Sequence, residues 1–111
     1  MLDRKNLNLG CVVYSLTTDG VKAEWLFSEN NEIERGVGSA KRVTKLIKER
    51  KFEGEFDIVY IDSNGDKSPK LRLSISFKSG YYYVTWKHKE LVTDIGIGIE
   101  SDNKLLVSYK K

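Results

Sequence analysis

The sequence predicts an all-β protein, an antiparallel up-and-down meander barrel of about eight strands. Three successive segments, residues 71–78, 82–87 and 95–99, alternate apolar residues with polar residues or glycine. Side chains along a strand point in turn to opposite faces of the sheet, so this period of two indicates half-buried strands. Short connections between such segments make them antiparallel neighbours. A long twisted meander loses its exposed edges by closing, although an antiparallel sandwich would show the same alternation.

The first part of the chain contains three strand candidates, residues 10–17, 21–28 and 33–40. Asp19-Gly20 lies between the first two and is typical of tight hairpins that need a positive φ. The polar residues 29–31 indicate the next turn. Gly36 and Gly38 are two positions apart, so they share one face of the third strand and allow close approach of a neighbouring group.

The segment over residues 39–50 has two interpretations. Val43, Leu46 and Ile47 have helical spacing, and Ser39 is a suitable N-cap, so a short helix would fit. The same residues also suit the end of a strand followed by a loop. Both alternatives stay open from the sequence.

The second half contains five further strand candidates, residues 55–62, 71–77, 81–88, 91–100 and 105–110. Asn64-Gly65 is the core of a predicted hairpin turn after the first of them. Pro69 stands at the entrance of the next strand, where its missing amide hydrogen does least harm. The remaining turns are predicted at Ser79-Gly80, Lys89-Glu90 and Asp102-Asn103.

Length and composition suit a single β-barrel domain over residues 1–111. The 19 basic and 16 acidic residues leave a net charge of only +3, which argues against nucleic acid as a partner. The single Cys11 cannot form an internal disulfide and is compatible with a reducing compartment. Residues 1–9 contain no apolar run of signal-peptide length, and no segment approaches the roughly 20 apolar residues of a membrane-spanning helix. We therefore expect a cytoplasmic protein without a membrane span, with a removed signal peptide left open.

The order of glycines, turns and aromatic residues from residue 36 to residue 105 resembles that of a known group of barrels. The marks are Gly-Val-Gly-Ser-Ala-Lys-Arg (36–42), Phe-Glu-Gly-Glu-Phe-Asp-Ile-Val-Tyr (52–60), Asp-Ser-Asn-Gly (62–65), Gly80, Tyr83, Trp86, Gly-Ile-Gly (96–98) and Leu105. This order resembles small bacterial β-barrel proteins of the lipocalin-like or avidin-like (calycin) type. The resemblance implies a meander barrel. It implies no particular ligand, because proteins of this broad type bind unrelated molecules and many have no assigned role.

Four aromatic residues are the preferred walls of a ligand site: Trp25, Tyr60, Tyr83 and Trp86. Flat, rigid rings suit small-molecule pockets, and an indole or phenol hydrogen can orient the ligand. We expect the barrel to bind a small apolar or amphipathic molecule at one end. The alternative is that these rings are ordinary core, because large apolar side chains usually serve packing.

A basic segment, residues 41–51, gives a weaker anion-binding prediction through Lys41, Arg42 and Lys45. Clustered cations attract phosphates or anionic headgroups, and nearby aromatics could stack on bases. A run of charge is more commonly a solvated face of the protein.

The sequence contains no combination of residues that indicates catalysis. The only histidine, His88, has no nucleophile motif beside it, and one histidine with one cysteine is too few for a metal site. We therefore expect a non-enzymatic protein without a metal or cofactor. A second hypothesis is an interaction or self-association module, a homodimer for example. It would use an outer sheet face or a barrel edge, with Tyr81 or Tyr82 together with the basic segment.

Overall fold

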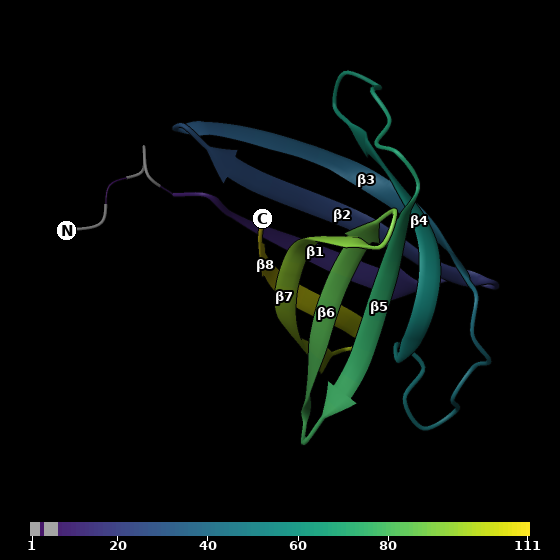
Figure 1. The fold of residues 1–111 in the computed structure, drawn as a ribbon. Coiled ribbons are helices and arrows are strands. Elements are labelled where there is room, and N and C mark those ends of the chain that lie inside the picture. Colours follow the sequence, from purple (N-terminus) through teal and green to yellow (C-terminus); the bar gives the residue numbers. More distant parts are fainter. Residues whose placement is uncertain (1–2, 4–6) are drawn as a thin grey trace.

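The computed structural model describes residue 3 and residues 7–111, and it shows a closed barrel of eight antiparallel strands (Figure 1). The strands are β1 (Leu9–Leu16), β2 (Gly20–Glu29), β3 (Glu32–Arg42), β4 (Gly54–Asp62), β5 (Leu71–Lys78), β6 (Tyr81–His88), β7 (Leu91–Ser101) and β8 (Lys104–Lys110). Each strand pairs with the next one along the chain, and β8 pairs with β1 to close the barrel. The predicted meander barrel is therefore confirmed. In Figure 1, β1 and β2 run across the view, whereas β5 and β6 run steeply down it.

Tight hairpins account for much of the chain reversal. Both central residues have positive φ in the turns at Asn30-Asn31, Ser79-Gly80, Lys89-Glu90 and Asp102-Asn103. Such turns match the right-handed twist of the strands that they join. The Asp19-Gly20 prediction was wrong in conformation, because neither residue has a positive φ. Gly20 instead begins β2, and its carbonyl oxygen accepts a hydrogen bond of 2.9 Å from the Thr17 amide.

The connection between β4 and β5 is longer than a tight Asn-Gly hairpin. The Asp62 carboxylate accepts hydrogen bonds from the amides of Asn64 and Asp66, both at 2.9 Å, and so shapes the turn after β4. An isolated bridge pairs Ile61 with Lys67 before the chain reaches β5. As a result, residues 63–70 form a loop at the edge of the barrel (Figure 1).

Residues 39–50 form the end of a strand followed by a loop, the second of the two predicted alternatives, and not a helix. Residues up to Arg42 complete β3, and the chain then follows an irregular loop to Gly54, with no helix among the described residues. The residues with helical spacing gain little burial there, since Val43 and Leu46 are each 50% exposed. Phe52 is fully buried instead and joins the core. The Arg42 guanidinium holds this loop by donating to the carbonyl oxygens of Glu53 and Lys51.

The core lies inside the barrel and is built from one face of each strand. The fully buried large side chains include Tyr14, Phe52, Phe56, Ile58, Leu73, Ile75 and Leu105. On β6 the inward residues are Tyr82, Val84 and Trp86.

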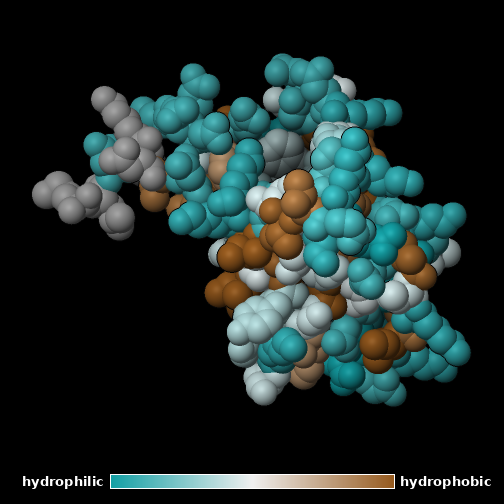
Figure 2. All heavy atoms as spheres, in the orientation of Figure 1, coloured by the Kyte–Doolittle hydropathy of each residue, from teal (hydrophilic) through white to brown (hydrophobic). Residues whose placement is uncertain are grey.

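The outer surface carries an apolar patch over β6, β7, β8 and β1. On β7 the glycines face inward, and Ile95, Ile97 and Ile99 point outward with 57–60% exposure. The strand register places these isoleucines beside outward residues of the neighbouring strands. Figure 2 shows apolar side chains gathered on this side of the barrel. We call the outer patch the following set: Cys11, Val13, Leu26, Tyr81, Tyr83, Ile95, Ile97, Ile99, Leu106 and Ser108.

Candidate ligand-binding pocket

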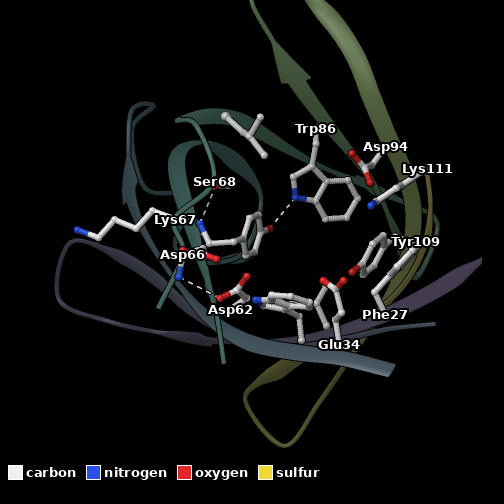
Figure 3. Close-up of a pocket in the computed structure, with 14 residues that line it drawn as sticks. Phe27, Glu34, Asp62, Asp66, Lys67, Ser68, Trp86, Asp94, Tyr109 and Lys111 are labelled. Carbon is white, nitrogen blue, oxygen red and sulfur yellow. Dashed lines mark hydrogen bonds between the residues drawn. The ribbon is translucent and has the colours of Figure 1, made fainter. Parts of the chain in front are cut away.

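A pocket of about 330 Å³ opens at the end of the barrel where β2, β4, β6 and β8 end (Figure 3). Its walls also include Val12 of β1 and Leu71 of β5. Five aromatic residues also line it: Trp25, Phe27, Tyr60, Trp86 and Tyr109. The opposite end lies on the side of the Phe52 loop, because alternate connections of a meander lie at opposite ends of the barrel. The pocket thus occupies one end of the barrel. At the other end, the buried Phe52 side chain is part of the core.

Glycines on neighbouring strands make room for three of these rings. A Cβ atom on Gly36 would lie 2.7 Å from Cζ2 of Trp25, and one on Gly38 would lie 2.8 Å from Cδ1 of Tyr60. A Cβ atom on Gly10 would lie 2.3 Å from Cζ of Tyr109. Real side chains essentially never approach so closely, so each ring lies over a backbone position that only glycine can occupy. This explains why the paired glycines of β3 face the barrel interior.

Hydrogen bonds fix the ring of Tyr60 at the floor of the pocket. The indole Nε1 of Trp86 donates to the Tyr60 hydroxyl at 2.6 Å, and the hydroxyl groups of Tyr14 and Tyr60 are 2.6 Å apart. Tyr14 has no exposed surface, and among the described residues Tyr60 is the one acceptor found for its hydroxyl hydrogen, because the nearby Trp86 indole can only donate. A buried hydroxyl hydrogen without an acceptor is costly, so we assign Tyr14 as the donor to Tyr60. Tyr60 then accepts two hydrogen bonds, and its own hydrogen is free to donate into the pocket.

The phenols at this end of the barrel are neutral at physiological pH. Burial raises the pKa of Tyr14 and Tyr60 well above the ordinary value of 10.0. Burial also raises the pKa of Tyr109, and the nearby carboxylates of Asp94 and Glu34 add to this effect. A neutral phenol can donate a hydrogen bond, whereas a phenolate could only accept one.

Charged side chains surround the mouth of the pocket. Four acidic residues line it, Glu34, Asp62, Asp66 and Asp94, together with Lys67 and Lys111. The Lys67 side chain extends away from the pocket (Figure 3). The Lys111 Nζ atom lies 4.4 Å from the ring centroid of Phe27 and 3.8 Å from Oε2 of Glu29. The pocket thus combines an aromatic interior with a charged rim, visible in Figure 3.

Three of the four predicted wall residues, Trp25, Tyr60 and Trp86, line this one pocket. Tyr83 does not line it. Tyr83 is 48% exposed on the outer face, where its ring packs edge-on against Tyr81 with a centroid separation of 5.4 Å. The reason is the alternation of β6, because Trp86 points inward and a residue three positions away must point outward.

The sequence analysis missed several pocket residues. Tyr109 shares the inward face of β8 with Leu105 and Val107, and that alternation was the available signal. Phe27 shares a face of β2 with Trp25 in the same way. Glu34 and Asp94 gave no signal, because a carboxylate on a strand is most simply interpreted as a solvated residue.

The predicted anion site does not form one cluster of free cations. Arg42 is engaged with the carbonyl oxygens of the 43–53 loop, and its guanidinium lies 4.6 Å from the ring centroid of Phe56. Lys41 and Lys45 are exposed. Anion binding by these lysines stays a prediction of the sequence.

No group of three or more His, Cys, Asp or Glu side chains among the described residues is arranged to hold a metal ion. Within the same residues, no helix has the length and apolar character needed to cross a membrane. Comparison of the chain with family models, curated proteins and solved structures gave no match. The structure itself therefore supplies the classification of this chain, a closed antiparallel barrel of eight strands.

Proposed function

We propose that this protein binds a small apolar or amphipathic molecule in the pocket at the open end of the barrel and is not an enzyme. The observation that carries the proposal is the aromatic lining of a cavity of about 330 Å³, with Trp25, Tyr60 and Trp86 on its walls. Small-molecule sites are typically concave and mostly apolar, with a few polar groups that set orientation. The free hydrogen of Tyr60 would supply such a group.

The binding free energy would come mainly from removing apolar surface from water, at roughly 25 cal/mol per Å². The rings need little reorganisation, because Tyr60 is held by Trp86 and the Trp25 indole donates to the Val37 carbonyl oxygen at 3.0 Å. A preorganised site loses less side-chain entropy when the ligand binds. The resemblance to calycin-type barrels fits this use of a barrel end, and the unpaired Cys11 fits a cytoplasmic location.

The test is a fluorescence titration with N-phenyl-naphthylamine, a neutral hydrophobic dye that brightens in apolar sites. We expect saturable binding to the natural protein and at least a severalfold weaker affinity in Trp25→Leu, since that variant removes one wall of the pocket. Tyr83→Leu is the matched control, because it removes an aromatic ring from the outer face. Equal loss in both variants, or no saturable binding at all, would contradict the proposal.

The outer patch favours a second candidate function, self-association through a face-to-face contact with a second copy of the chain. The residues of the outer patch are uncharged, and the charged neighbours Glu24 and Lys110 lie at its border, beside Val13 and Ile95. The centre of the patch therefore suits an identical apolar face better than a charged partner.

Sedimentation velocity over a range of concentrations tests this second candidate. Ile97→Lys places a charge at the centre of the outer patch and should abolish the dimer. Ile33→Lys is the control, because Ile33 is equally apolar and 62% exposed but lies on β3, outside the patch. A natural protein that sediments as a monomer at every concentration would exclude this function.

A further inference from the structure

The pocket combines aromatic rings with an excess of negative charge at its mouth. We propose that it selects organic cations, with an ammonium or quaternary ammonium group at the mouth and an apolar body directed toward the floor. This inference rests on the proposed ligand-binding function and specifies the chemical class of the ligand.

The charge at the mouth is opposite in sign to that of the whole chain. Four acidic residues line the pocket against two lysines, of which Lys67 extends away from it (Figure 3), although the protein carries a net charge of +3. A concentration of one sign around a low-dielectric cleft focuses the electric field and attracts ligands of the other sign. A ligand anion would have to approach these carboxylates, which disfavours it.

Two of the carboxylates are available to a ligand. Asp62 is partly committed, because its Oδ1 atom accepts the amides of two loop residues. Glu34 and Asp94 have no ion pair or side-chain hydrogen bond within the part of the chain that the structure describes. Both residues line the pocket together with the aromatic ring of Tyr109 (Figure 3).

The aromatic rings supply a second attraction for a cation. The face of an indole or phenol ring carries negative potential, so cations bind over it, most strongly over tryptophan. The chain shows this directly, because the Lys111 ammonium lies 4.4 Å from the centroid of the Phe27 ring, which lines the pocket. An ammonium group is therefore already accommodated on one ring of this site.

The hydrogen-bond network gives the bound cation an orientation. The free hydrogen of Tyr60 at the floor would repel an ammonium group and favour an apolar or acceptor group there. The carboxylates of Glu34 and Asp94 hold the charge at the mouth. A ligand with a cationic head and an apolar body matches both ends of the pocket.

The experiment compares three ligands of similar size and different charge. Benzyltrimethylammonium, its neutral carbon analogue neopentylbenzene and the anion phenylacetate compete separately for bound N-phenyl-naphthylamine. We expect the cation to bind roughly tenfold more tightly than the neutral analogue, and the anion to bind most weakly. The advantage of the cation should shrink at high salt, since screening weakens exposed charge interactions.

The double variant Asp94→Asn with Glu34→Gln identifies the source of this selectivity. It should lower the cation affinity about five- to tenfold and leave the neutral analogue unchanged, because only charge is removed. Asp102→Asn is the matched control, since it removes a carboxylate from the β7–β8 turn, outside the pocket. Selectivity that survives the double variant would overturn the role of these carboxylates.

The outcomes separate the two proposals. If the neutral analogue or the anion binds as tightly as the cation, the inference of cation selectivity fails and ligand binding stands. If none of the three ligands displaces the dye and the dye itself does not bind, the proposed function fails and this inference fails with it.

Discussion

The hydroxyl groups of Tyr14 and Tyr60 lie 2.6 Å apart, although the two residues are 46 positions apart in the chain. This contact joins β1 to β4 across the barrel interior, and the Trp86 indole adds β6 to it. The core and the pocket therefore share one polar network. A change in this network should be measurable both as stability and as ligand affinity.

The first prediction concerns the centre of this network. Tyr60→Phe removes the acceptor of the buried Tyr14 hydroxyl and of the Trp86 indole hydrogen, so both are left without a partner. We expect the free energy of unfolding to fall by about 1–3 kcal/mol. Urea denaturation followed by tryptophan fluorescence measures the change.

The double variant Tyr14→Phe with Tyr60→Phe is the control for this prediction. It removes the stranded Tyr14 hydroxyl and should recover part of the lost stability, which a double-mutant cycle quantifies. Strictly additive losses would contradict the assigned network.

The second prediction concerns alkaline pH. Burial, together with the hydrogen bond of 2.9 Å that its hydroxyl donates to Glu100, raises the pKa of Tyr82 from 10.0 to about 12. The folded protein therefore binds this proton more tightly than the unfolded chain does. The stabilisation is complete below the unfolded value of 10.0 and is lost as the pH rises toward about 12.

Urea unfolding at several pH values across this window should show stability decreasing with pH. Tyr14 and Tyr60 contribute in the same direction, because burial raises their pKa values too. Tyr82→Phe should reduce the slope. An unfolding free energy that is constant over this window would refute the prediction.

The third prediction concerns the glycine under the Tyr60 ring. Gly38→Ala introduces a Cβ atom 2.8 Å from Cδ1 of Tyr60, so the ring must move. We expect about 1–3 kcal/mol of destabilisation together with weaker dye binding, since the ring is part of the pocket wall. Ser39→Ala, at the next and exposed position of β3, should leave both properties unchanged. Unaltered dye affinity in Gly38→Ala would show that the ring position does not shape the pocket.

The fourth prediction concerns the 43–53 loop. Phe52 is fully buried, so Phe52→Ala should cost about 3–5 kcal/mol of stability through lost burial and the cavity left behind. Leu46→Ala, in the same loop but half exposed, should change stability by less than about 0.5 kcal/mol. Thermal unfolding of the two variants distinguishes them, and similar losses would mean that the loop packs differently.

The strands and most turns were predictable because their signals are local. Alternation marks a strand wherever it occurs, and pairs such as Asp102-Asn103 adopt the positive φ of a tight hairpin without distant help. The loop after Arg42 was not predictable in this way. Its conformation depends on a buried Phe52 and on backbone acceptors for Arg42, which become neighbours only in the folded protein.

The pocket was predicted in part for a related reason. Alternation says that Tyr83 and Trp86 face opposite sides, but it does not say which side is the interior. On β7 it would have been natural to place the isoleucines inside, yet the glycines face inward there because Val107 of β8 fills the adjacent space. The positions of Glu34 and Asp94 at the rim could not be predicted from the sequence. They depend on how β3 and β7 are aligned with their neighbouring strands.

The pairing of β1 with β8 has a consequence for how this barrel folds during its synthesis on the ribosome. Every other pairing joins strands that emerge one after the other, whereas β1 must wait for the last strand to be synthesised. Until then one edge of the nascent sheet has no partner, and such edges invite association with other chains. Successful maturation of the protein thus depends on how quickly its two extremities find each other.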